Sequence, residues 1–201
     1  MNLFLHGASD FNVMQGDTLR DPKILQGGNI AKFDCVIANP PFSLENWGAT
    51  EWSSDKYKRN IYGTPSDSCG DYAWIQHMIC SMSSGKGRMA VVMPQGILFR
   101  GNQEAEIRKQ LVESNLIEAV VTLGDKLFYG TGLSPCFLII RRMKQAHHSG
   151  RILMIDGSQI LTQKRAQNIL EENDIDRLYS LYQNYSDEED YSRIVTLQEI
   201  R

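Results

Sequence analysis

The sequence lacks both a long hydrophobic run and an excess of charge of either sign. Its longest apolar stretches, such as Met89–Met93, fall far short of the ~20 residues that a membrane-spanning helix requires. The 21 basic residues are balanced by 24 acidic ones, so no overall basic field attracts nucleic acid. Met1–His6 has neither a basic start nor a long apolar core, and we expect no signal peptide. Attraction to a polyanion must therefore be local or come from a partner.

Cysteine is also scarce, and its spacing excludes the usual zinc patterns. The four cysteines are Cys35, Cys69, Cys80 and Cys136. No two of them have metal-ligand spacing, and no Cys/His cluster is present. Cys35 and Cys136 lie in apolar runs, where cysteine usually behaves as a small buried hydrophobe. We therefore expect a cytoplasmic protein without a disulfide framework and without a metal.

Strand and helix patterns alternate through the middle of the chain. We predict strands at 11–15, 33–38, 88–93, 116–123, 136–141 and 151–155, and helices at 72–83, 102–114 and 170–182. Asp71 is a good candidate for the N-cap of the first of these helices. Residues 43–70 read as a long polar loop, which is typical of functional or mobile segments. The pattern predicts an α/β fold with a mostly parallel sheet and helices on both faces.

One tetrapeptide, Asn39-Pro40-Pro41-Phe42, directly follows a predicted buried strand. The Asn side-chain oxygen and the carbonyl of the first proline accept hydrogen bonds, and the prolines hold the backbone rigid. The aromatic ring offers a flat face for stacking. Two aimed acceptors beside such a face suit a planar exocyclic amine, which they activate by positioning rather than by a general base.

A structural interpretation of the same residues is a Pro-Pro turn capped by the Asn side chain. Chance yields this tetrapeptide in about one chain in a thousand of this length, and its place after an apolar strand favours function. The tetrapeptide alone does not separate an adenine in DNA from an RNA base or a glutamine amide of a protein, since all three present a planar amine.

The wider sequence resembles a known family. An Asn-Pro-Pro-aromatic motif after a strand is similar to the catalytic motif of amino-methyltransferases that use S-adenosylmethionine. A longer set of segments resembles, in order, the methylation subunit of type I restriction–modification systems: Met1–Gly7, Gly16–Leu19, Phe33–Ser43, Asp71–His77, Pro94–Gly101 and Leu127–Gly132. The resemblance implies methyl transfer to the exocyclic amine of a flipped adenine in double-stranded DNA. It also implies specificity and restriction subunits as partners.

The resemblance further implies a partial Rossmann-like methyltransferase fold and a set of site residues. Residues 1–160 correspond to the C-terminal portion of the catalytic domain, and 161–201 to a helical extension. The implied catalytic residues are Asn39, Pro40, Pro41 and Phe42. Asp17 and Asn39 would contact the cofactor, while Phe128 would line the target-base pocket or pack in the core.

Other polar residues have structural interpretations that involve no catalytic role. His77 lies within a predicted helix, and because this mechanism needs no base we expect a structural role. The basic segment Lys56–Arg59 reads equally as a phosphate contact or as a solvated charged loop. Asp17, which follows Gly16, has a turn as its structural alternative.

The resembled family holds its cofactor with a Gly-rich loop between a strand and a helix. Residues 1–201 contain no such loop. We therefore expect this chain alone to bind S-adenosylmethionine poorly and to be inactive by itself. The alternative is a non-catalytic assembly or DNA-binding remnant. The strand that ends at Asn39 would lack a neighbour, so we expect either residues 11–15 to pair with it or the chain to self-associate at this edge.

Overall fold

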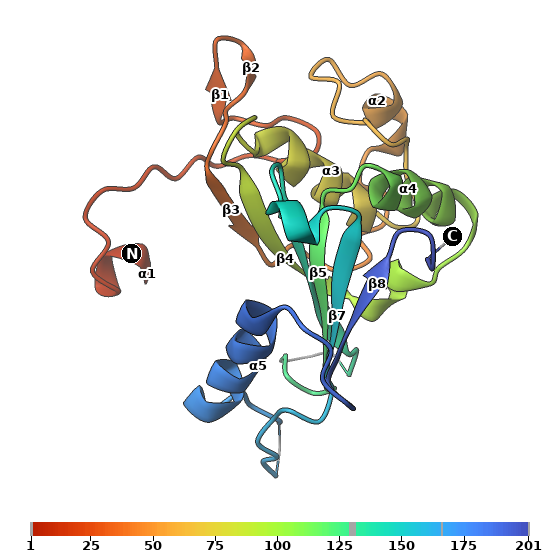
Figure 1. Ribbon diagram of the computed structural model, residues 1–201. Helices are drawn as coiled ribbons and strands as arrows, with labels where there is room; N and C mark the ends of the chain where they lie inside the picture. The colour runs from red at the N-terminus through yellow and green to blue at the C-terminus, as the bar shows by residue number, and fades with distance from the viewer. Residues whose placement is uncertain (1, 129–131, 166, 201) are drawn as a thin grey trace.

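The computed structural model describes residues 2–128, 132–165 and 167–200 (Figure 1). Its helices are α1 (Asn2–Leu5), α2 (Ala49–Ser53), α3 (Asp71–Ser81), α4 (Asn102–Glu113) and α5 (Glu172–Asn184), with short 3-10 helices η1 (Gln95–Leu98) and η2 (Ala146–His148). Its strands are β1 (Leu25–Gln26), β2 (Asn29–Ile30), β3 (Cys35–Ala38), β4 (Arg88–Pro94), β5 (Ile117–Leu123), β6 (Pro135–Arg141), β7 (Arg151–Gly157) and β8 (Ser192–Thr196). No described helix is long and apolar enough to cross a membrane.

The main sheet has six strands in the order β3-β4-β6-β5-β7-β8. The α/β class is confirmed, but the expectation of a mostly parallel sheet is wrong. Only the β3–β4 and β5–β7 pairs are parallel, whereas β6 is antiparallel to both of its neighbours and β8 is antiparallel to β7. The reason is the connection from β5 to β6, which contains no crossover helix among its described residues and returns the chain beside β5.

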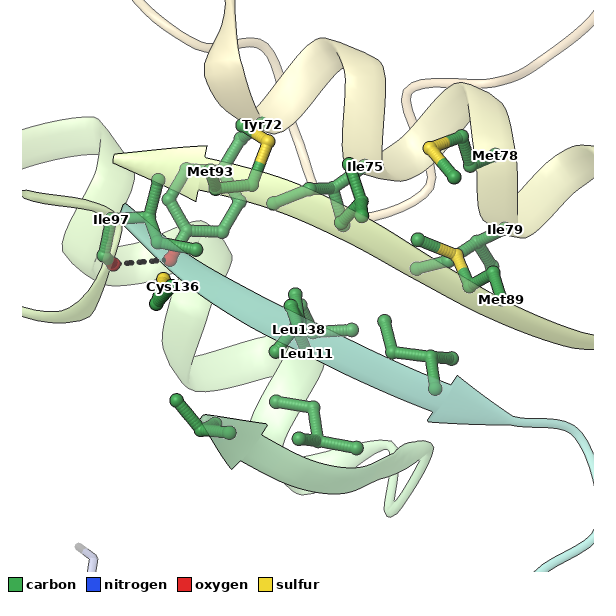
Figure 2. Close-up of a cluster of buried hydrophobic side chains, with 14 of the residues drawn as sticks. Tyr72, Ile75, Met78, Ile79, Met89, Met93, Ile97, Leu111, Cys136 and Leu138 are labelled. Atoms are coloured by element: carbon green, nitrogen blue, oxygen red, sulfur yellow. Dashed lines mark hydrogen bonds between the residues drawn. The ribbon is translucent and has the colours of Figure 1, made fainter. Parts of the chain in front are cut away.

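Helices cover both faces of this sheet, as predicted. On one face α3 and α4 pack against the sheet through residues such as Ile75, Ile79 and Leu111 (Figure 2). On the other face α5 contributes Leu178 and Leu181 to a second buried cluster with β5 and β7. Apolar side chains therefore alternate between two buried faces along the central strands. Polar functional side chains are consequently expected at the ends of the strands.

Three segments differ from the sequence-based prediction. The strand predicted to be buried, β3, lies at one end of the sheet with Cys35 and Ile37 exposed, because β4 covers only one of its two sides. Residues 11–15 form no strand, and Phe11, Val13 and Met14 are exposed, because an alternating pattern becomes a strand only where a neighbour accepts its hydrogen bonds. The segment 161–201 is not simply a helical extension. It carries α5, which a capping box of Glu171 and Asp174 begins, and also β8, which joins the main sheet.

The long segment 43–70 is packed rather than loose. It contains α2, and Trp47 and Trp52 are both buried, with their ring centroids 5.6 Å apart in an edge-to-face arrangement. Ala73 of α3 belongs to the same apolar cluster. This packing fixes the segment against α3 and leads the chain from the end of β3 back to the start of that helix.

Candidate active site

Asn39-Pro40-Pro41-Phe42 lies at the carboxyl edge of β3, where the prolines prevent the strand from continuing. Pro40 is buried, Phe42 is half-buried, and Asn39 and Pro41 are exposed. In the described part of the chain no hydrogen bond engages the Asn39 side chain, so it does not cap the turn. The amide oxygen of Asn39 is therefore free to accept a hydrogen bond from a ligand.

Phe42 meets Phe128, which the fold brings from the loop after β5. The two ring centroids are 6.3 Å apart and the ring planes are inclined by 82°, an edge-to-face contact. Phe128 is half-buried, so it is neither a core residue nor a free surface ring. The three residues that follow it in the family-like segment, 129–131, lie outside the described residues. The structure thus brings two predicted site aromatics together.

The turn after the motif is anchored by Asp71, whose role the sequence reasoning missed. Gly70, and not Asp71, is the N-cap of α3, and the Asp71 side chain makes no capping hydrogen bond. Instead, its carboxylate Oδ1 accepts the backbone N–H of Ser43 at 2.7 Å. Asp71 opens the family-like segment Asp71–His77, which is the one signal in the sequence that pointed to it.

Asp17 lies in a turn, as the structural interpretation of this residue predicts. Its Oδ1 accepts the backbone N–H groups of Leu19 and Arg20, at 3.0 and 2.9 Å. Its Oδ2 lies 4.0 Å from a guanidinium nitrogen of Arg20, and the carboxylate is half exposed. One oxygen is therefore committed to the turn and the other remains an accessible acceptor.

Arg59 ties this turn to the body of the protein. Its side chain is only 1% exposed, so it is not the phosphate contact that the basic segment Lys56–Arg59 suggested. It donates to the carbonyl oxygens of Thr18 and Leu19, at 2.9 and 2.6 Å, and pairs with Asp55 at 2.8 Å. The neighbouring Lys56 and Lys58 are exposed.

His77 has the structural environment that was predicted for it. Its Nδ1 lies 3.1 Å from Nη1 of Arg59 and accepts a hydrogen bond from it. Burial first, and then the charge of Arg59, lower the pKa of His77 to about 4. The imidazole is consequently neutral near pH 7 and holds Arg59 in place.

Three potential metal ligands approach one another next to the Asp71 anchor. Single ligand atoms of Cys69, Asp71 and Glu104 all lie within 4.8 Å of one another. The Arg100 guanidinium, however, donates to both carboxylates and already supplies the positive charge. Burial raises the pKa of the Cys69 thiol to about 12. Among the described residues this group forms a buried ion-pair cluster around Arg100.

The structure is an α/β domain with a mixed six-stranded sheet and an Asn-Pro-Pro-Phe turn at the carboxyl end of β3. The profile of the N-6 DNA Methylase family matches residues 1–201, and the chain belongs to this family. The type I restriction enzyme MjaVII methylase subunit of Methanocaldococcus jannaschii is 35% identical over 212 residues, which cover 100% of this chain and 36% of that protein.

Two further relatives agree with this assignment. The type I restriction enzyme HindI methylase subunit of Haemophilus influenzae is 30% identical, over 100% of this chain and 45% of its own length. The crystal structure of a type I restriction-modification methyltransferase subunit from Streptococcus thermophilus superposes with a TM-score of 0.87 at 28% identity, covering 99% of this chain and 42% of that one. The chain therefore spans less than half the length of these three relatives.

Proposed function

We propose that this chain forms the target-base half of an adenine-N6 DNA methyltransferase, as part of the methylase subunit of a type I restriction–modification complex. One observation carries the proposal: at the carboxyl end of β3, the exposed Asn39 amide comes three residues before Phe42, whose ring contacts Phe128 edge-to-face. This is the edge where ligands bind in α/β sheets. Membership of the N-6 DNA methylase family favours adenine in DNA over an RNA base or a protein glutamine.

The chemistry follows from the residue types. Oδ1 of Asn39 and the carbonyl oxygen of Pro40 accept the two N–H groups of the exocyclic amine of an extruded adenine. Phe42 stacks on the base, and Phe128 supports the Phe42 ring edge-on. With both protons held, the nitrogen lone pair leaves conjugation with the ring and points at the incoming methyl carbon. As the new N–C bond formed, the bond between the methyl carbon and the cofactor's sulfur would break and S-adenosylhomocysteine would leave. One amine proton would then pass to solvent, and no side chain would need to act as a base.

The cofactor half of the site is only partly represented in this chain. S-adenosylmethionine supplies the electrophilic methyl group when it is bound. Oδ2 of Asp17, which lies 4.0 Å from a guanidinium nitrogen of Arg20, would accept a hydrogen bond from the amino group of the cofactor's adenine, and Asn39 would contact its methyl end. No Gly-rich strand-to-helix loop is present in residues 1–201 to hold the remainder. We therefore propose that cofactor binding needs residues beyond this chain's own.

The partners of the proposed complex are double-stranded DNA and the specificity and restriction subunits. The chain carries a net charge of −3, so the attraction to DNA must come largely from the rest of the complex. In the family that the sequence resembles, the specificity subunit recognises the DNA sequence, and we propose the same division here. If the chain supported no methyl transfer even within an assembled complex, the alternative of a non-catalytic assembly or DNA-binding remnant would be favoured.

The test is a methyl-transfer assay on a chimera in which this chain replaces the matched region of the MjaVII methylase subunit. The chimera is assembled with the specificity subunit of that system, and transfer of labelled methyl groups to adenine in duplex DNA is measured. Asn39→Ala should lower kcat by about 100-fold, because it removes one aimed acceptor. Phe42→Ala should weaken productive base binding by about 10-fold.

Asn29→Ala is the matched control, since Asn29 is an exposed asparagine in the small β1–β2 hairpin. It should leave the rate within about twofold of the parent chimera. Unchanged transfer in Asn39→Ala would contradict the proposal. Methylation of RNA or of a protein glutamine, with duplex DNA left unmodified, would support the corresponding alternative substrate.

A further inference from the structure

The residue that directly follows the motif has an unusual backbone conformation. Ser43 has φ of 50°, a left-handed value that non-glycine residues rarely adopt. Such a conformation persists only where its surroundings over-determine it. The backbone N–H of Ser43 donates to Oδ1 of Asp71 at 2.7 Å. Asp71 therefore provides the contact that fixes the chain as it leaves Phe42.

Asp71 is itself held by a charged partner. Its residue exposure is 0%, and its second oxygen, Oδ2, accepts a hydrogen bond from Nη2 of Arg100. The same guanidinium donates from Nε to Glu104, which is 5% exposed. Burial opposes the charge of Arg100, but its bonds to Glu104 and Asp71 outweigh this effect and raise the pKa of the guanidinium above its ordinary value. A single guanidinium is thus shared between the two buried carboxylates.

Arg100 is in turn fixed to the segment that leaves β4. Its backbone N–H donates to the carbonyl oxygen of Gly96 in η1 at 2.9 Å. Its own carbonyl oxygen accepts a hydrogen bond from Nη1 of Arg108 at 2.8 Å. Tyr72, next to Asp71, donates its hydroxyl to the carbonyl oxygen of Ile97 at 2.7 Å, as Figure 2 shows. The turn after β3 and the turn after β4 are therefore joined through Asp71 and Arg100.

We propose that Asp71 and Arg100 are positioning residues for the methyl transfer: they hold Asn39-Pro40-Pro41-Phe42 in the geometry that engages the target amine. This inference rests on the proposed function. The pair touches neither base nor cofactor. It acts through Ser43 and the backbone of the motif. A displacement of about 1 Å at reacting groups is enough to lower a rate by about 100-fold.

Three variants and one control test this role. Asp71→Ala removes the acceptor for Ser43, Asp71→Asn keeps an acceptor but loses the ion pair, and Arg100→Lys keeps the charge but not the two-pronged donor. Gln76→Met is the control. Gln76 is an equally buried polar residue of α3, and its bonds reach the backbone at Tyr62 and Gly63 instead of the motif.

The first measurement is amide hydrogen exchange at Ser43 in this chain itself. Exchange should accelerate by more than about 10-fold in Asp71→Ala and by less in Asp71→Asn, while Gln76→Met leaves it within about twofold. The second measurement uses the chimera with its specificity subunit. Asp71→Ala and Arg100→Lys should lower kcat by about 100-fold and about 10-fold, with the KM for S-adenosylmethionine within about twofold of the parent value.

Two results would overturn the inference. The first is an exchange rate of the Ser43 amide that is the same in Asp71→Ala as in the parent chain. The second is a loss of kcat in Gln76→Met as large as that in an equally destabilised Asp71→Ala. If the parent chimera methylates no adenine, the proposed function fails instead. The exchange measurement still decides whether Asp71 holds the turn.

Discussion

Nη1 of Arg59 lies 3.1 Å from Nδ1 of His77, at a point where the turn of Thr18 and Leu19 meets helix α3. The neutral imidazole accepts from the guanidinium, and protonation of His77 would set two positive charges against each other. The contact is therefore both a structural link and a pH-dependent one.

His77 should make the stability of the chain depend on pH. Its pKa of about 4 in the folded state lies below the ordinary 6.5, so the stabilisation is complete above pH 6.5 and is lost as the pH falls toward 4. The loss should be about 3 kcal/mol of unfolding free energy. His77→Asn, which keeps an acceptor for Arg59, should remove most of this dependence in urea unfolding between pH 4.5 and 7.5. His6→Asn, at an exposed histidine, should not, and equal slopes in all three proteins would contradict the assignment.

Arg59→Lys should destabilise the fold although it preserves the charge. A lysine cannot reach Asp55, Thr18 and Leu19 together, and the pairing of a buried carboxylate is weakened. We expect a loss of about 3 kcal/mol in urea unfolding. Arg193→Lys, whose parent residue forms an exposed pair with Glu199, should leave the unfolding midpoint unchanged. An Arg59→Lys protein as stable as the parent would show that the cluster does not hold the Asp17 turn.

The isolated chain should bind S-adenosylmethionine weakly. Asp17 offers one accessible carboxylate oxygen, and no Gly-rich turn of residues 1–201 is present to hold the other end of the cofactor. Titration calorimetry of the chain should give a dissociation constant weaker than about 100 μM, which corresponds to about −5.5 kcal/mol. The chimera serves as the positive control. Low-micromolar binding by the chain alone would refute this expectation.

The chain should self-associate through its open sheet edge. β3 is the last strand on its side of the sheet, and Phe33 and Ile37 are 45% and 77% exposed there. Unpaired strand edges with apolar side chains favour pairing with another chain. Sedimentation velocity should detect dimers at about 100 μM, a concentration at which even weak association becomes visible, and Ile37→Lys should reduce them. Met143→Lys, at an equally exposed residue in the turn after β6, is the control. A monomer at that concentration would contradict the prediction.

Much of the secondary structure followed from local patterns. Pro40 and Pro94 ended two predicted strands near their observed ends, because proline has no N–H for the sheet. Helix α4 lies within one residue of its predicted range, since its apolar residues recur on one face. The strand predicted at residues 11–15 is wrong for the opposite reason. A strand needs a hydrogen-bonding neighbour, and alternation along the sequence does not supply one.

The candidate chemistry can be derived from the amino-acid sequence alone: an Asn-Pro-Pro-Phe turn directly after an apolar strand, whose acceptors and ring come with the covalent structure. Which residues surround that turn depends on the packing of distant segments. It set Phe128 against Phe42, buried Arg59 beneath the Asp17 turn, and turned Asp71 from a helix cap into the anchor of Ser43. These contacts join segments far apart in the chain, and the strand order and packing that create them are not encoded in any local pattern.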